Sequence, residues 1–224
     1  MCGERLVSPH AYMNEHGEAR CGLCRRMEQP YVKAGAYGSY EGGLRDLIHM
    51  LKYEGVRPAA NVLGRMLSEV FAGLEPSFGD AKLWVVPVPL HTSKMHQRGF
   101  NQAEAITRVA LKLANSERYT LAAGSLERVR PTQSQIGLSR HQRRENLRGA
   151  FRVTNPEEIS GRDILLVDDV FTTGTTASEC ARILRRAGAA RVWVATVART
   201  LKAEAQLAHL EPETDARTSM AAHG

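Results

Sequence analysis

Two adjacent carboxylates and a cluster of hydroxyl side chains follow one apolar stretch of this sequence. The stretch runs from Ile164 to Val167, and Asp168 and Asp169 come directly after it. Two residues later, a turn of small side chains consists of Thr172, Thr173, Gly174, Thr175 and Thr176. An unbroken apolar run is typical of a buried parallel strand, and apolar residues at helical spacing beyond the turn predict a helix there.

Each part of this segment suits one part of a ribose 5-phosphate. The open N–H groups and positive dipole end of a helix attract a phosphate, and Gly174 lets the backbone approach it closely. Threonine hydroxyls add further donors, so a monophosphate fits the turn. Carboxylates only accept hydrogen bonds, which makes Asp168 and Asp169 suitable partners for the two hydroxyls of the sugar.

Other interpretations of the segment explain it less well. A Walker A loop needs a lysine after its last glycine, and Thr175 stands there instead. No G-x-G-x-x-G pattern follows a predicted strand, which disfavours a dinucleotide fold. An ordinary strand–turn–helix with one capping residue accounts for one polar side chain, not for two acids and four threonines.

The sequence VDDVFTTGTT resembles the phosphoribosyl diphosphate (PRPP) binding motif of the type I phosphoribosyltransferases. Two further segments, PVPLHTSKMHQRGFNQA at 87–103 and TQSQIGLSRHQRRENLRGAF at 132–151, are similar to the ComF family of phosphoribosyltransferase-like proteins. The resemblance covers residues 2–200. It implies a type I phosphoribosyltransferase-like α/β fold, with a mainly parallel sheet flanked by helices.

The resemblance also implies an activity, the transfer of a 5-phosphoribosyl group from PRPP to a nitrogen acceptor with release of pyrophosphate. Asp168 and Asp169 would be the catalytic acids that hold the ribose hydroxyls, and the threonine turn would hold the 5-phosphate. Lys94 and Arg98 would face the diphosphate, a leaving group that needs fixed positive charge. Mg²⁺ prefers oxygen ligands and would bridge the diphosphate and ribose oxygens. The sequence identifies neither a general base nor the acceptor.

Positive charge is concentrated between Arg128 and Arg152, where seven arginines accompany a single acid. Apolar residues are few there, which predicts a mobile loop. The resemblance implies that this loop closes over PRPP and excludes water. The arginines assigned to it are Arg140, Arg143, Arg144 and Arg148. A solvated surface and a groove for single-stranded DNA are the alternatives, although few aromatic residues lie near these arginines to stack on bases.

The N-terminal residues contain half of a zinc ribbon. Cys21 and Cys24 form a C-x-x-C pair, and with Cys2 they are the candidate zinc ligands. ComF-like proteins carry a second C-x-x-C upstream, so three explanations stay open: the native chain starts earlier, His10 or His16 completes the site, or zinc has been lost. Thiols in a metal-free arm are the other alternative. Four unevenly spaced cysteines do not indicate a disulfide framework.

Apolar spacing predicts the elements that position these residues. Amphipathic helices are expected at 44–51, 59–71 and 103–113, and buried strands at 83–88 and 192–197. The strand–helix–strand order around the motif predicts a right-handed crossover, with the ligand at the carboxyl ends of parallel strands. The resemblance places Lys52 and Tyr53, at the end of the first helix, in a hood over the acceptor. A solvated helix end explains them equally well.

Length and composition predict one main domain with two appendages. The 224 residues divide into a partial zinc-ribbon-like arm (1–30), a phosphoribosyltransferase-like domain (31–202) and a disordered tail (203–224). No apolar run reaches the roughly 20 residues of a membrane span and no signal segment begins the chain, so we expect a cytoplasmic protein. The net charge of +6 suits anionic partners.

Two functions are consistent with these features. In the first, the chain is an enzyme of pentosyl transfer that uses PRPP and Mg²⁺. In the second, it is a ComF-type competence and DNA-uptake accessory protein, in which the arginine-rich segment and zinc arm bind single-stranded DNA or competence proteins and the PRPP pocket acts as a ligand sensor. A third interpretation is a relic fold with neither activity. The sequence leaves the oligomeric state open.

Overall fold

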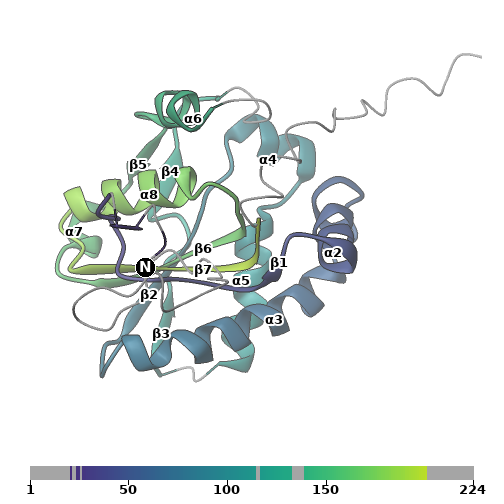
Figure 1. Cartoon of the computed structure of the whole chain (residues 1–224), viewed down its shortest axis with the longest axis horizontal. Coiled ribbons are helices and arrows are strands. Elements are labelled where there is room, and N and C mark those ends of the chain that lie inside the picture. Colours follow the sequence, from purple (N-terminus) through teal and green to yellow (C-terminus); the bar gives the residue numbers. More distant parts are fainter. Residues whose placement is uncertain (1–20, 22–23, 26, 115–116, 133–138, 201–224) are drawn as a thin grey trace, which may run out of the picture.

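The computed structural model describes residues 21, 24–25, 27–114, 117–132 and 139–200. Helices and strands alternate along most of this length (Figure 1). In chain order they are β1 (Ala34–Ser39), α2 (Gly42–Tyr53), α3 (Ala59–Leu74), the 3₁₀ turn η2 (Glu75–Ser77), β2 (Leu83–Pro87), α4 (Thr92–Arg98), α5 (Gln102–Leu113), β3 (Tyr119–Leu121), β4 (Leu126–Arg128), α6 (Arg140–Leu147), β5 (Phe151–Val153), α7 (Pro156–Ile159), β6 (Asp163–Phe171), α8 (Thr175–Arg186) and β7 (Arg191–Arg199).

Five strands form a parallel sheet in the order β1-β7-β6-β2-β3. Helices cover both of its faces: α3 and α5 lie on one side and α8 on the other (Figure 1). The prediction of an α/β fold with a parallel sheet flanked by helices is therefore confirmed. The strand that carries the acidic pair, β6, lies at the centre of the sheet.

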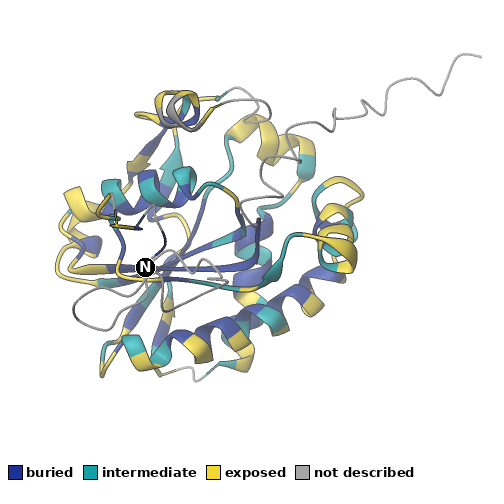
Figure 2. Cartoon of the chain, viewed as in Figure 1, coloured by how far each residue is buried: buried dark blue, intermediate teal, exposed yellow. Residues whose placement is uncertain are grey.

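Burial on both faces explains why the central strands read as unbroken apolar runs. Along β6, Ile164 and Leu166 pack in the core cluster beside α8, whereas Leu165 and Val167 pack in the cluster beside α3 and α5. Figure 2 shows these strands as the most continuously buried part of the molecule. The two cores hold the central strand in one register, because a slip of one residue would exchange its faces.

The acid-bearing strand is longer than the sequence predicted. Pairing between β6 and β7 continues past the acids as far as Phe171 and Arg199. The pairing with β2, in contrast, ends at Val167. Asp168 and Asp169 therefore belong to a part of β6 that keeps a strand neighbour on one side only.

We expected much of the arginine-rich segment to be a mobile loop, but β4, α6 and β5 form in it. Its two ends, β4 and β5, pair in an antiparallel hairpin from Leu126↔Val153 to Arg128↔Phe151. Between them, 140–147 form helix α6, which packs against α8. The apolar residues that anchor this unit, Leu147 and Phe151, are few but fully or almost fully buried, so low apolar content did not mean an absence of structure.

Five further elements were not predicted: the edge strands β1 and β3, the helices α4 and α7, and the 3₁₀ turn η2. Each is only three to seven residues long, too short for a clear period. Most of the N-terminal arm and the residues after 200 lie outside the described residues. Within the described part of the chain, no helix has the length and apolar character to cross a membrane.

Candidate functional site

The threonine-rich turn joins β6 to α8. Helix α8 begins at Thr175, and Gly174 occupies its N-cap position with a φ of 73°, in the left-handed region that favours glycine. A Cβ atom at Gly174 would lie 2.5 Å from Cζ of Phe171, so the turn also needs glycine for space. The hydroxyls of Thr173 and Thr175 are hydrogen-bonded at 2.8 Å. The expected strand–turn–helix is therefore present, with Phe171 packed directly beneath its glycine.

The turn gives α8 an N-terminus suited to an anion. No side chain caps the helix, since Gly174 has none, and the backbone N–H groups of the first turn keep their positive partial charge. Thr175 and Thr176 are the first two residues of the helix and are only partly buried, and Thr172 is exposed. These hydroxyls and N–H groups can donate hydrogen bonds to a phosphate placed at the turn.

The two aspartates have different surroundings, because successive strand residues point to opposite faces. Asp169 is turned towards α2, where one of its oxygens lies 2.9 Å from Nζ of Lys52. Asp168 lies near Arg128 and the buried thiol of Cys180, which belongs to α8. Its carboxylate also accepts a hydrogen bond from the backbone N–H of Asp169. The acids are thus close together but held by different elements.

The Lys52–Asp169 ion pair is largely shielded from water, with side-chain exposures of 18% and 12%. Burial alone would lower the pKa of the Lys52 ammonium, but the charge and hydrogen bond of Asp169 outweigh it and the pKa is raised. The helix that ends at Tyr53 is therefore tied electrostatically to the acidic pair. The resemblance placed Lys52 over the site, and its contact with Asp169 makes it a member of the site.

Asp168 is the carboxyl group whose protonation changes near neutrality. Burial, followed by the neighbouring charge of Asp169, raises the pKa of Asp168 to about 7. Lys52 and Arg128 act in the opposite direction but do not cancel the effect. A carboxyl group that exchanges its proton near pH 7 can serve as a general acid or base.

Arg128 is a site residue that the sequence analysis did not single out. It lies at the end of β4, and its backbone pairs with that of His91, just before α4. Its guanidinium lies over the Phe151 ring at 5.5 Å, and its Nε is buried without a hydrogen-bond partner in the described part of the chain. Burial lowers its pKa. The only signal in the sequence was its membership of the arginine-rich segment.

The two cations proposed for the diphosphate belong to α4, which follows β2. Lys94 is exposed on this helix. Arg98, in its last turn, donates a hydrogen bond to Gln102 at 3.1 Å and lies over the ring of Tyr53 at 5.2 Å. Both residues therefore follow the carboxyl end of β2. The guanidinium of Arg98, however, is directed to α2 rather than to the threonine turn.

The four arginines proposed for a closing loop are placed by α6. Arg140, Arg143 and Arg144 are within it, and Arg148 follows it. Arg143 is 6% exposed, so it is part of the packing of this helix, and burial lowers its pKa. Arg148 is exposed, 3.9 Å from Glu145. The side chains of Arg140 and Arg144 lie outside the described residues.

The proposed zinc site is only partly within the described residues. Cys21 and Cys24 are buried in the core cluster beside α8, whereas Cys2, His10 and His16 lie outside the description. Among the residues that are described, no group of three or more His, Cys, Asp or Glu side chains is placed to hold a metal ion. The zinc assignment therefore stays a prediction.

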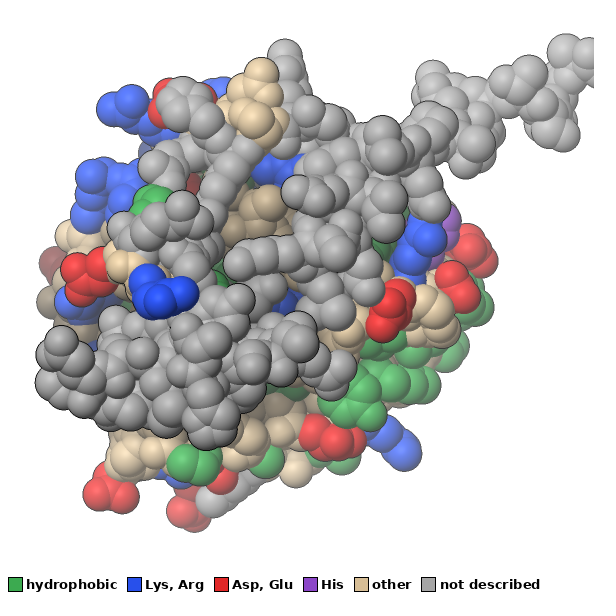
Figure 3. Space-filling view, in the orientation of Figure 1, with side chains coloured by type: hydrophobic (Ala, Val, Ile, Leu, Met, Phe, Trp, Pro, Cys, Tyr) green, Lys and Arg blue, Asp and Glu red, His purple; other side chains and the backbone are tan. Residues whose placement is uncertain are grey.

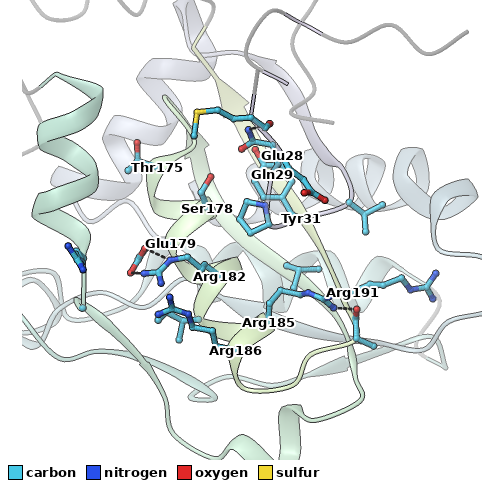
Figure 4. Close-up of a pocket in the computed structure, with 18 of the residues that line it drawn as sticks. Glu28, Gln29, Tyr31, Thr175, Ser178, Glu179, Arg182, Arg185, Arg186 and Arg191 are labelled. Atoms are coloured by element: carbon cyan, nitrogen blue, oxygen red, sulfur yellow. Dashed lines mark hydrogen bonds and ion pairs between the residues drawn. The ribbon is translucent and has the colours of Figure 1, made fainter. Parts of the chain in front are cut away.

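A pocket of about 1180 Å³ lies along the outer face of α8, between this helix and 27–32 (Figure 4). Lys and Arg side chains gather on this side of the molecule, around α6 and α8 (Figure 3). Many of the pocket's charges are already used within the protein: Arg182 pairs with Glu179, and Arg185 donates to backbone carbonyls after the helix. Among the predicted site residues whose side chains the structure describes, Thr175 and Arg148 line it and the others do not.

Comparison with known proteins gives matches to a domain family, to curated proteins and to solved structures. A model of the phosphoribosyl transferase domain matches residues 103–218. The DNA utilization protein YhgH of Escherichia coli K12 is 34% identical over 187 residues, which are 83% of this chain and 80% of that protein. Competence protein F of Haemophilus influenzae is 30% identical over 201 residues, 88% of this chain and 82% of that protein. Among solved structures, phosphoribosylpyrophosphate synthetase from Mycobacterium smegmatis overlaps with a TM-score of 0.37 and 17% identity, over 65% of this chain and 36% of that one. An overlap this loose carries no functional conclusion.

Proposed function

This chain belongs to the phosphoribosyl transferase domain family, with YhgH and ComF competence proteins as homologues, and on that premise we propose that it is a PRPP-responsive accessory protein of DNA use. In this function, the turn of residues 172–176 binds the 5-phosphate of PRPP. Asp168 and Asp169 accept hydrogen bonds from the ribose hydroxyls. Occupancy of this site then controls how another surface of the protein binds single-stranded DNA.

The observation that carries the sensor function is the ion pair between Lys52 and Asp169. A ribose hydroxyl that binds Asp169 competes with the Lys52 ammonium for the same carboxylate oxygens. Because Lys52 belongs to the last turn of α2, ligand binding changes the contacts that hold the end of this helix. A ligand can shift a conformational equilibrium only by such a difference in contacts between two states.

Magnesium would enter this site with the diphosphate of PRPP. The carboxylate oxygens of Asp168 and Asp169 are of the type that Mg²⁺ prefers, so the donor set fits. When bound, the ion would neutralise diphosphate charge and orient its oxygens. The chain's own contribution is the acidic pair, the uncapped helix N-terminus and the basic residues on β4 and α4.

Transfer of the phosphoribosyl group is the second candidate function. The pKa of Asp168, raised by burial to about 7, is the observation that favours it. A carboxylate with this pKa can accept the proton that a nitrogen nucleophile loses as it attacks the sugar. Transfer predicts pyrophosphate release in the presence of a suitable base or amine, whereas the sensor function does not require it.

Three measurements separate these functions. Thermal unfolding with PRPP and Mg²⁺ reports binding, and at a concentration 100 times Kd the stabilisation is about 2.7 kcal/mol. Asp169→Asn should remove this stabilisation, and Asp163→Asn, at the start of the same strand and paired with Arg191, is the matched control that should keep it. Pyrophosphate release across a panel of bases and amines tests transfer. A PRPP-dependent change in single-stranded DNA affinity tests the sensor.

If neither PRPP nor ribose 5-phosphate stabilises the wild-type protein, both candidate functions are wrong. If PRPP binds but DNA affinity does not respond to it and pyrophosphate is released, the protein is a transferase. Binding with a DNA response and without pyrophosphate release supports the sensor.

A further inference from the structure

A group of planar side chains in contact with one another lies on the surface where α2 and α4 meet. The rings of His49 and Tyr53, one helical turn apart on α2, have centroids 4.5 Å apart and a tilt of 38°. The guanidinium of Arg98 lies 5.2 Å from the centre of the Tyr53 ring. Tyr53 therefore contacts planar groups of both helices, the imidazole of His49 on α2 and the guanidinium of Arg98 on α4.

A second pair of the same kind follows closely in the chain. The guanidinium of Arg57 lies over the ring of Phe100 at 5.4 Å, and one of its terminal nitrogens approaches the Cβ position of Gly99 to 4.0 Å. Gly99 ends α4 and lies between Arg98 and Phe100. The two pairs are thus joined by the α4–α5 connection, and we call the five side chains of His49, Tyr53, Arg57, Arg98 and Phe100 the stacking surface.

The stacking surface is partly open to solvent: Arg57 is exposed, whereas Arg98 and Phe100 are half-buried and Phe100 packs against the core. Tyr53 is 57% exposed, and the side chain of His49 is 55% exposed. Covering a large aromatic ring that is this open would gain hydrophobic free energy. Arg57, exposed at the start of the α3 region, and Lys94, exposed on α4, add positive charge nearby. Glu54 contributes the opposing negative charge, 3.8 Å from His49.

We propose that the stacking surface binds unpaired bases of single-stranded DNA. Aromatic rings and guanidinium planes are the groups on which unpaired bases stack, and flanking arginines and lysines attract the phosphates between them. A free nucleobase as transfer acceptor is the rival occupant. Small ligands bind in concave sites that bury most of their surface, and a ring that is more than half exposed is the opposite of such a site.

The inference deepens the proposed function, because it supplies the DNA surface that the ligand site controls. Lys52 and Tyr53 are consecutive residues of α2, so their side chains leave the helix about 100° apart. One reaches Asp169 in the ligand site, and the other belongs to the stacking surface. A change at the Lys52–Asp169 pair is therefore transmitted to the DNA surface through a single peptide unit.

Fluorescence anisotropy with a labelled 15-residue oligothymidylate tests the proposal. Tyr53→Ala should weaken binding about 5- to 100-fold, the range expected for loss of one stacked base. Tyr53→Trp should retain the wild-type affinity. Tyr37→Ala, which removes a 45% exposed tyrosine from the edge strand β1, is the matched control and should bind as the wild type does.

An abasic oligomer of the same length separates stacking from charge, since it keeps the phosphates and lacks the bases. The wild type should prefer oligothymidylate to the abasic strand, and Tyr53→Ala should lose this preference while its salt dependence stays the same. Equal affinity of the wild type for both strands, or unchanged affinity in Tyr53→Ala, would overturn the proposal. Competition by free thymine at concentrations near those of the strand would assign the surface to an acceptor instead.

Thermal stabilisation by PRPP and Mg²⁺ should persist in Tyr53→Ala, because the turn of residues 172–176 and the acidic pair are unchanged, although loss of the ring that Arg98 contacts can reduce its size. This readout separates the two proposals. If PRPP and Mg²⁺ do not stabilise the wild type, the proposed ligand site is wrong, whereas the oligomer results alone decide the stacking surface.

Discussion

The ion pair between Lys52 and Asp169 makes a quantitative prediction about stability. Two unit charges about 3 Å apart attract by roughly 5.5 kcal/mol at an effective dielectric constant of 20, before the cost of desolvation is subtracted. Removing one partner of a buried pair typically costs about 3–5 kcal/mol, because the other charge stays buried and unpaired. The pair keeps 18% and 12% exposure, which favours the lower end of that range.

We therefore expect Lys52→Met and Asp169→Asn each to lower the free energy of unfolding by about 3 kcal/mol. The double variant should lose much less than the sum, since it leaves neither charge alone. Urea unfolding of the four proteins at pH 7 gives the coupling energy. The surface pair of Arg108 and Glu104, with exposures of 57% and 31%, is the control cycle and should couple by less than about 1 kcal/mol.

The pH dependence of the single variants adds a second check. Lys52→Met removes a charge that lowers the pKa of Asp168, so this pKa should rise further in the variant and its destabilisation should grow as the pH rises through about 7. Additive single effects, or a coupling energy no larger than that of the Arg108–Glu104 control, would show that Lys52 and Asp169 do not depend on each other as a buried ion pair. The proposed link between the ligand site and α2 would then have no energetic basis.

Two further predictions concern the turn and the acidic pair. Gly174→Ala should destabilise the fold by more than the about 1–2 kcal/mol that a left-handed alanine costs, because its Cβ would also meet Phe171; Gly124→Ala, at a φ of 89° with open space, should show the backbone cost alone. The pKa of Asp168, raised from 3.8 to about 7, means that the folded state binds a proton that the unfolded state has lost. Wild-type stability should therefore fall between about pH 4 and pH 7, by at most about 4 kcal/mol, and Asp168→Asn should flatten this fall.

Urea unfolding measures both. Equal destabilisation by the two glycine variants would mean that the turn does not pack against Phe171. A wild-type stability that rises from pH 4 to pH 7 in the same way as that of Asp168→Asn would contradict the buried position of this carboxyl group.

The central strand and its turn could be predicted because their determinants are local. Ile164 to Val167 are apolar on both faces of a covered strand, and Gly174 supplies a backbone conformation that other residues reach only with strain. The helices α2, α3, α5 and α8 could likewise be predicted from the helical spacing of their apolar residues. The sequence also indicated that the turn begins a helix, which is the feature a phosphate would need.

The partners of the acidic pair could not be predicted, because they depend on contacts between distant segments. Lys52 is more than a hundred residues from Asp169, and no local pattern shows that α2 crosses over the end of β6. Arg128 is one of seven arginines in its segment, and only the pairing of β4 with β5 and its bridge to His91 bring it to the site. Spacing also cannot show that the arginine-rich segment forms a helix, since α6 is almost wholly polar and depends on Leu147 for its anchoring.

Calorimetric titration of the full chain with PRPP in the presence of Mg²⁺ tests most directly whether the turn of residues 172–176 and the acidic pair form a phosphoribosyl site. We expect one binding site per chain in the wild type, competition by ribose 5-phosphate, and loss of binding in Asp169→Asn but not in Asp163→Asn. Absence of binding to the wild type, or binding that Asp169→Asn leaves unchanged, would contradict it.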